Sequence, residues 1–230
     1  MFIGHFAPAF VAASITARRP KAGPGLGTFF VAAVLVDCVF FALALIGIEK
    51  IGSGGFANVT LPYDLFTHPI THSLAGTGIW ALGFGAIIGF WYRNFFAGML
   101  AALVVASHWL LDWIMHAPGL TLTLSGAGDL YGLGLEQHKG PAIALELALT
   151  LAAFAFYLKR SRGPILQPVM LFAVMLGLQI AIWITPQPDI AGLGFYAEAL
   201  IAFTILAALA SWTGENRYFM QRSGLAAAGR

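Results

Sequence analysis

The sequence predicts an all-α fold, a polytopic bundle of helices that crosses a membrane about seven times. Of its 230 residues, 59% are hydrophobic and only 10% are charged, and the mean hydropathy is +0.83. Soluble domains are roughly 25% charged, so a water-soluble fold is not expected. The apolar residues also occur in runs close to the length of about 20 residues that a helix needs to cross a bilayer.

Seven apolar segments are separated by glycine, proline and charged residues. They cover residues 2–17, 28–48, 73–91, 97–115, 141–158, 165–185 and 190–212. The first segment is short and contains Pro8, which is compatible with a re-entrant or tilted half-span. The chain has no convincing internal repeat and no long linker. We therefore expect a single transmembrane domain over residues 1–230.

The basic residues predict the orientation, because cytoplasmic loops are enriched in Lys and Arg. With the N-terminus outside, the cytoplasmic side collects Arg18, Arg19, Lys21, Arg93, Lys159, Arg160, Arg162, Arg217, Arg222 and Arg230. The other side holds only Lys50 and Lys139. This asymmetry predicts an N-out, C-in chain. The net charge of +2 is small, and nothing suggests a nucleic-acid partner.

Histidines and intramembrane acids gather toward the outer side of this map. The six histidines are His5, His68, His72, His108, His116 and His138, and the acids inside apolar segments are Asp37, Asp112, Glu146 and Glu198. Every Lys and Arg lies in a loop or tail, so none sits beside these acids within a span. Ionised acids in hydrocarbon are costly and usually paired. These acids are therefore either protonated or neutralised by histidine or a metal ion.

The sharpest local pattern is His108-x-x-x-Asp112-x-x-x-His116. Residues four apart share one face of a helix, so the segment presents imidazole, carboxylate and imidazole as a stripe. Such a stripe suits zinc, manganese or iron. A polar stripe that hydrogen-bonds neighbouring helices is the alternative.

A second pattern is Thr67-His68-Pro69-Ile70-Thr71-His72-Ser73. Proline suits a first helical turn and disfavours helix at the preceding residue. We therefore expect His68 to cap the helix and His72 to project from its first turn, as the better ligand candidate. Surface positions are expected for Asp64, Asp129, Glu136 and His138.

Four of these features resemble the bacterial family of inner-membrane metal-dependent hydrolases. They are Gly4-His5, the intramembrane Asp37, Thr71-His72-Ser73 and Ser107-His108-x-x-x-Asp112. The likeness covers residues 1–116, while residues 117–230 add a loop and three further spans. The order of the His and Asp residues is also similar to that of zinc-dependent phospholipase C. The resemblance implies a divalent metal, with zinc favoured over manganese or iron. The ligands would be His5, Asp37, His72, His108 and Asp112, and Asp112 would be placed to bridge two ions.

The expected function is hydrolysis of a lipid or lipid phosphoester at the non-cytoplasmic leaflet of the bacterial inner membrane. A catalytic divalent ion lowers the pKa of bound water and polarises the scissile group. His116 or Glu198 would act as proton shuttle, and the sequence does not choose between them. A metal-ion or proton-coupled transporter is the alternative, because acids and histidines inside a membrane also form translocation paths. A structural membrane protein with a degenerate site is the third reading.

Overall fold

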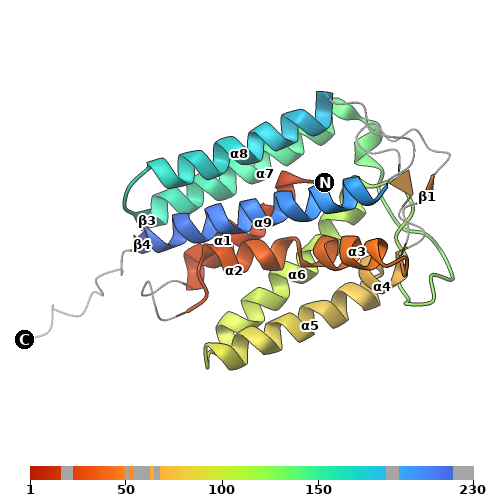
Figure 1. Ribbon diagram of the computed structural model, residues 1–230, viewed down its shortest axis with the longest axis horizontal. Coiled ribbons are helices and arrows are strands. Elements are labelled where there is room, and N and C mark those ends of the chain that lie inside the picture. The colour runs from red at the N-terminus through yellow and green to blue at the C-terminus, as the bar shows by residue number, and fades with distance from the viewer. Residues whose placement is uncertain (17–22, 50–51, 54–62, 65–67, 185–191, 220–230) are drawn as a thin grey trace, which may run out of the picture.

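The computed structural model describes residues 1–16, 23–49, 52–53, 63–64, 68–184 and 192–219. Within these ranges the chain is mainly helical, and long helices run beside one another in a bundle (Figure 1). This arrangement confirms the predicted all-α fold.

Helices of very different lengths make up the described chain, together with four strands of two residues each. In chain order, the helices are η1 Ile3–Phe6, α1 Ala7–Thr16, α2 Leu26–Ala33, α3 Leu35–Leu45, α4 Pro69–His72, α5 Leu74–Trp91, α6 Phe95–Met115, η3 Leu135–Gln137, α7 Lys139–Arg160, α8 Leu166–Ile184 and α9 Leu193–Glu215. Two antiparallel pairs of strands join β1 Gly52–Ser53 to β2 Tyr63–Asp64 and β3 Ser161–Arg162 to β4 Tyr218–Phe219.

Five helices, α5 to α9, are long and apolar enough to cross a membrane. Helices α2 and α3 pass the same test only as a pair, and they meet at an angle of 55°. The described residues therefore contain five candidate spans, or six if the bent pair counts as one. The remaining segment expected from the sequence is a shorter apolar helix, Ile3–Thr16. The count is lower than seven because the first segment is short and because the second is broken between α2 and α3.

The break between α2 and α3 positions one acid of the site. Segment 28–48 is a continuous apolar run in the sequence, yet the helix is interrupted at Val34, where φ is −112° and ψ is 14°. Asp37 consequently lies in the first turn of a new helix rather than in the middle of a straight one. A helix N-terminus favours a negative charge.

The short first helix lies in the core of the bundle. Helix α1 packs against α2, α6 and α7, and both Phe6, just before it, and Phe10, within it, are fully buried. The Phe6 ring stacks on Phe30 with centroids 4.6 Å apart, and the Phe10 ring lies 5.7 Å from Tyr157. This aromatic packing fixes the segment that carries His5.

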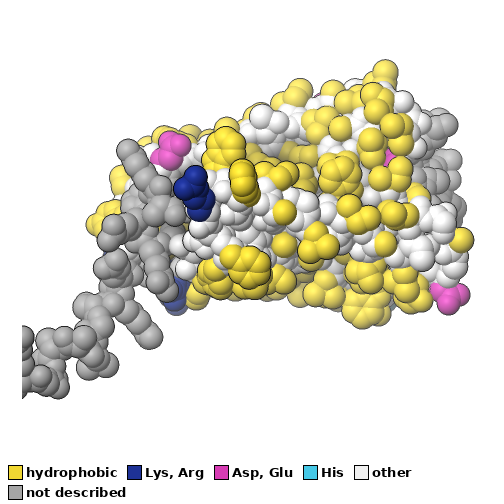
Figure 2. Space-filling model, turned by 90° about the horizontal axis from the view of Figure 1, so that it is seen from below, with side chains coloured by type: hydrophobic (Ala, Val, Ile, Leu, Met, Phe, Trp, Pro, Cys, Tyr) yellow, Lys and Arg dark blue, Asp and Glu magenta, His cyan; other side chains and the backbone are white. Residues whose placement is uncertain are grey.

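The two ends of the bundle differ in charge. Lys159 and Arg160 end α7, Arg162 lies in β3, and Arg217 precedes β4. The Lys and Arg side chains visible in Figure 2 lie at this end, while apolar side chains extend along the rest of the face shown. The opposite end of α6 and α7 carries the loop of residues 116–138 (Figure 1).

Candidate metal centre

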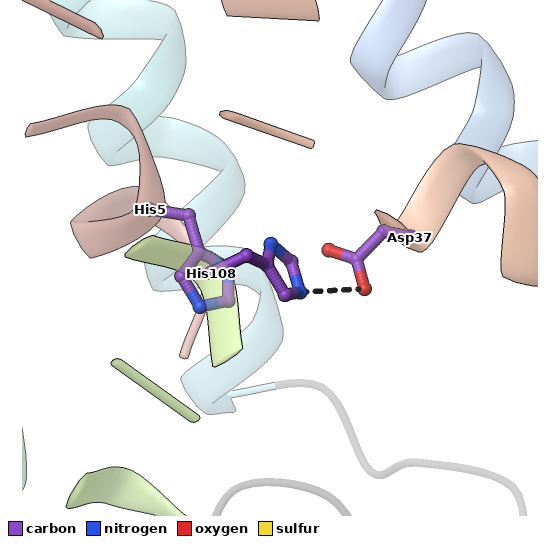
Figure 3. A group of neighbouring side chains, drawn as sticks. All are labelled: His5, Asp37 and His108. Carbon is purple, nitrogen blue, oxygen red and sulfur yellow. Dashed lines mark ion pairs between the residues drawn. The ribbon is translucent and has the colours of Figure 1, made fainter. Parts of the chain in front are cut away.

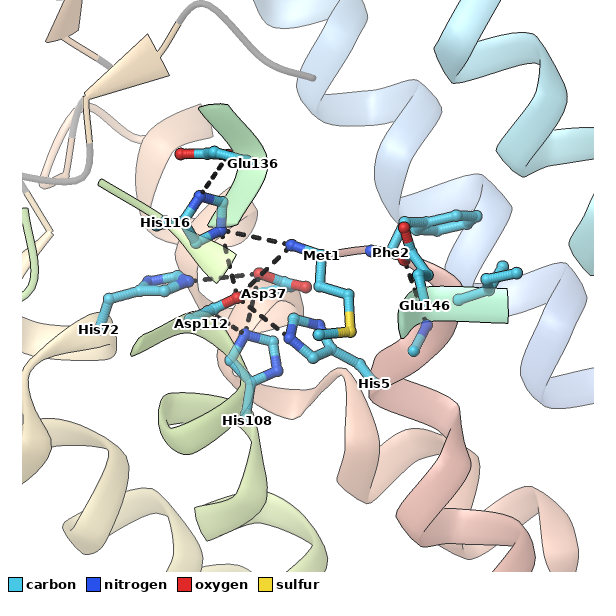
Figure 4. Close-up of polar contacts among 12 residues, drawn as sticks. Met1, Phe2, His5, Asp37, His72, His108, Asp112, His116, Glu136 and Glu146 are labelled. Atoms are coloured by element: carbon cyan, nitrogen blue, oxygen red, sulfur yellow. Dashed lines mark hydrogen bonds and ion pairs between the residues drawn. The ribbon is translucent and has the colours of Figure 1, made fainter. Parts of the chain in front are cut away.

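Six side chains from four elements converge near the end of α6 that joins this loop (Figure 4). They are His5 of η1, Asp37 of α3, His72 of α4, His108 and Asp112 of α6, and His116 directly after α6. The structure therefore brings together all five residues expected to bind metal and one of the two expected proton shuttles. All six are largely buried, with Asp37 and His116 the more exposed.

Asp112 lies at the centre of this cluster. Its Oδ1 is 3.0 Å from His5 Nε2 and 3.2 Å from His116 Nε2, and its Oδ2 is 3.2 Å from His108 Nε2. The stripe predicted on one face of α6 is thus present, although His116 itself is the C-cap with extended backbone.

Asp37 approaches the same cluster from α3. Its Oδ1 lies 3.3 Å from His72 Nε2 and 3.4 Å from His108 Nε2, and Figure 3 shows it facing His108, which lies beside His5. Two groups of three residues each offer candidate ligand atoms that lie within 4.8 Å of one another. The first group is His5, Asp37 and His108, and the second is His72, His108 and Asp112. The imidazoles turn Nε2 toward the carboxylates.

The outer nitrogens of two imidazoles are already hydrogen-bonded. His108 Nδ1 lies 3.0 Å from the carbonyl oxygen of Ala33, and His116 Nδ1 lies 3.0 Å from Glu136 Oε2. A carbonyl or ionised carboxylate only accepts, so each Nδ1 carries the hydrogen. A neutral imidazole then has its lone pair on Nε2, the atom that faces the aspartates. This is how metal-binding histidines are usually oriented.

Several inward-facing atoms have no hydrogen-bond partner. His5 Nδ1 and Nε2, His108 Nε2 and Asp112 Oδ1 are buried without one, although buried polar atoms are normally paired. Two ligands of a tetrahedral zinc ion, each about 2.0–2.2 Å from the metal, lie about 3.3 Å apart. The distances of 3.0 to 3.4 Å between Nε2 and carboxylate oxygens match that spacing. These residues therefore fit a divalent cation.

The charges around the cluster also favour a divalent cation. Five acids with largely buried side chains lie at this end: Asp37, Glu49, Asp112, Glu136 and Glu146. Among the described residues, no Lys or Arg forms an ion pair with them; the amino nitrogen of Met1 lies 3.6 Å from Asp112 Oδ1 and 3.3 Å from His116 Nε2. In the described parts of the chain, Asp37 and Asp112 face imidazoles and this amino group, and a divalent cation bound among them would add positive charge.

The predicted surface position of Glu136 is wrong, because its side chain is fully buried. Its Oε1 accepts from the Ala117 amide at 3.1 Å, and its Oε2 faces His116 Nδ1. Burial alone would raise the pKa of Glu136, but the hydrogen bonds from His116 and Ala117 outweigh it and lower that pKa. An ionised Glu136 therefore orients His116. The sequence missed it because a glycine-rich loop has no periodicity that reports burial.

Glu146 of α7 holds the segment that carries His5. Its Oε1 accepts from the amides of Phe2 at 2.5 Å and Gly4 at 3.2 Å, while Gln179 of α8 accepts from the Ile3 amide at 3.2 Å. Backbone amides thus satisfy this intramembrane acid. The second half of the chain contributes to the centre by anchoring the first.

Glu198 is not brought to the cluster. Its side chain is exposed on α9, and no hydrogen bond or ion pair within the described parts of the chain joins it to the six residues. Helical periodicity alone could not tell which face of α9 points inward. The prediction that Glu198 could act as proton shuttle is therefore not supported by the geometry, which leaves His116.

The remaining histidines lie where the local pattern predicted. His68 is the N-cap of α4, with Pro69 in the first turn, and its buried ring stacks on Phe40 with centroids 4.2 Å apart. His138 and Asp129 are exposed, as expected. The side chain of Asp64 lies outside the described residues.

Comparisons with family models, with curated proteins and with solved structures gave no match to this chain. The case for a function therefore rests on the geometry of the site.

Proposed function

We propose that this protein is a membrane-embedded, metal-dependent hydrolase that acts on a lipid phosphoester. The observation that carries the proposal is the convergence of imidazole Nε2 atoms on Asp37 and Asp112 while outer Nδ1 atoms are hydrogen-bonded elsewhere. A zinc ion bound there, with manganese or iron as alternatives, would lower the pKa of a bound water and polarise the phosphoester.

The residues divide into ligands and one candidate acid–base group. His5, Asp37, His72, His108 and Asp112 would hold the metal. His116 has a side chain 12% exposed, against 1% for His108, so it is the more accessible imidazole. With the hydrogen on Nδ1, its Nε2 carries the lone pair and would accept a proton at the site. This Nε2 lies 3.3 Å from the Met1 amino nitrogen and 3.2 Å from Asp112 Oδ1.

An apolar groove supports a lipid as the substrate. It has a volume of about 490 Å³ and lies between α1, α6 and α7. Its lining includes Ala7, two residues after His5, and Leu111, directly before Asp112, and extends to Ile15 and Leu100. At about 1.5 Å per residue, the stretch along α1 is about 12 Å long. We infer that an acyl chain lies here while its headgroup linkage reaches the metal.

The charge distribution supports an outward-facing site. The cluster lies near the end of α6 opposite its Asn94 cap, whereas Lys159, Arg160 and Arg162 lie at the other end of the bundle. Because basic residues favour the cytoplasmic side, the centre would face the non-cytoplasmic leaflet. The membrane would be the bacterial inner membrane, as the resemblance implies.

Metal content and lipid turnover of the purified protein test the proposal. We expect wild-type protein in detergent to contain zinc, manganese or iron and to hydrolyse a phospholipid slowly, and a chelator to abolish turnover until metal is restored. His108→Ala should remove both metal and activity, whereas His138→Ala, which changes an exposed histidine, should leave both intact.

The acyl-chain assignment has its own test. Ala152→Phe places a ring in the groove, so we expect it to lower turnover of long-chain lipids more than that of a short-chain analogue, with metal content unchanged. Metal-coupled flux into liposomes made of non-cleavable lipids, with no hydrolysis over a broad lipid panel, would contradict the enzyme and favour a transporter.

A further inference from the structure

A buried carboxylate outside every sequence motif lies behind one of the proposed ligands. Glu49 follows α3 and is only 2% exposed. Its Oε1 accepts from the amides of Ile70 at 2.8 Å and Thr71 at 3.2 Å. Its Oε2 accepts from the Thr71 hydroxyl at 2.7 Å. This carboxylate therefore engages both the backbone and a side chain of α4.

The Thr71 hydroxyl links Glu49 to His72. Thr71 Oγ1 lies 2.8 Å from His72 Nδ1, and both atoms are buried. A hydroxyl has a single hydrogen, and here it is donated to Glu49. Toward His72 the same oxygen acts as acceptor, so Nδ1 carries the hydrogen. In neutral His72 the lone pair is then on Nε2, which lies 3.3 Å from Asp37 Oδ1.

We propose that Glu49 is a positioning residue, which acts through the Thr71 hydroxyl to hold His72 in the tautomer that presents Nε2 to a divalent cation. The proposal rests on the metal centre proposed above and adds a residue that touches neither metal nor substrate. Such outer partners fix the ring of a metal-binding histidine and make its free nitrogen more basic. Thr71 in the Thr-His-Ser motif thereby gains a role of its own.

The competing explanation is that Glu49 only ties α4 to the end of α3 through its backbone contacts. Thr71→Val separates the two roles, because it removes the hydroxyl but leaves the amides of Ile70 and Thr71 to bond Glu49. Thr71→Ser restores the hydroxyl. Thr150→Val is the matched control, since Thr150 is a fully buried threonine whose hydroxyl donates to the Glu146 carbonyl at 2.8 Å.

Two measurements on protein in detergent test the proposal. Zinc affinity, measured by competition with a chromophoric chelator, should fall about 10–100-fold in Thr71→Val and stay near the wild-type value in Thr71→Ser and Thr150→Val. Nitrogen-15 NMR of labelled histidine in metal-free protein, with the signal assigned by His72→Gln, should show hydrogen on Nδ1 in the wild type and loss of this preference in Thr71→Val.

A second substitution keeps the test decisive if Thr71→Val does not fold. In Glu49→Gln the amide can donate to Thr71 Oγ1, which turns the hydroxyl toward His72 and moves the imidazole hydrogen to Nε2. Unchanged tautomer and zinc affinity in Thr71→Val and Glu49→Gln would overturn the proposal, as would equal loss of affinity in Thr71→Ser and Thr71→Val. Wild-type protein that binds no metal would overturn the proposed function instead, while the metal-free NMR experiment would still decide the tautomer.

Discussion

Buried charge is handled differently at the two ends of the bundle. At the end with β3 and β4, the guanidinium of buried Arg217 donates to Ser161 Oγ at 2.7 Å, Ser161 O at 3.0 Å, Gly163 O at 3.2 Å and Pro164 O at 2.9 Å. These acceptors are neutral atoms of the α7–α8 connection. The cation thus donates four hydrogen bonds within the protein, and its effect is to hold that connection against the start of β4.

At the other end, several inward-facing atoms of the cluster have no hydrogen bond within the described residues. His108 Nδ1 and Glu146 have backbone partners, whereas His5 Nε2, His108 Nε2 and Asp112 Oδ1 face one another without hydrogen bonds. Buried polar atoms left unpaired cost free energy. The comparison teaches that burial of charge does not by itself mark a functional site. The mark is a set of buried imidazole nitrogens and carboxylate oxygens that face one another at the spacing of metal ligands.

The largest effect should follow from removing the central carboxylate. Asp112→Asn keeps the size of the side chain but removes a charged ligand, so metal affinity should fall by more than about 100-fold, beyond the loss typical of an outer partner. Because the substitution keeps the shape of the side chain, the metal-free protein should keep its helical fold. Metal analysis and thermal melting check both, with exposed Asp129→Asn as control. If Asp112→Asn binds metal as tightly as the wild type, Asp112 is not a ligand, and the comparison of a metal site at one end with a structural cation at the other fails.

The Arg217 end should respond in the opposite way. Arg217→Met leaves carbonyl and hydroxyl acceptors without their donor, and we expect a loss of about 2 kcal/mol in the free energy of unfolding with metal content unchanged. Arg160→Met is the control, because Arg160 is exposed and makes one hydrogen bond of 3.3 Å to Ser14 O. Loss of metal in Arg217→Met without loss of stability would show that this end is not merely structural.

The sequence predicted which side chains converge because of the apolar surroundings in which they stand. In apolar segments, Asp37, His108 and Asp112 are conspicuous, since polar groups in hydrocarbon are retained only where something compensates for their cost. The same reasoning predicted the long helices α5 to α9, whose apolar runs are bounded by glycine, proline and charge. It failed for Glu198, because an acid in an apolar run can lie on either face of its helix.

The sequence could not predict the parts that depend on tertiary contacts. No proline or glycine marks the break at Val34, so the bend that brings Asp37 to the cluster has no local signal. Glu49 and Glu136 lie outside the apolar runs and look like ordinary surface acids. Their partners are 22 and 20 residues away in the sequence, at Thr71 and His116.

The smallest effect should come from Glu136, which distinguishes an outer partner from a ligand. In Glu136→Gln, one of the two contacts must face an NH₂ group: either the Ala117 amide loses its acceptor, or His116 Nδ1 does. The second case moves the imidazole hydrogen to Nε2, toward Asp112, and His116 then cannot accept a proton there.

We therefore expect Glu136→Gln to lower lipid turnover by about tenfold, equivalent to about 1.4 kcal/mol, with metal content close to wild type if His116 is the proton acceptor. If His116 is instead a further ligand, metal affinity should fall by the same factor and turnover only in proportion. Gln137→Glu, which alters the exposed neighbour on η3, controls for a change of charge in the loop. Measuring metal affinity and turnover on the same preparations separates the two roles. If Glu136→Gln changes neither metal affinity nor turnover, Glu136 does not orient His116. Its buried carboxylate would then have only a structural role, as Arg217 has at the other end of the bundle.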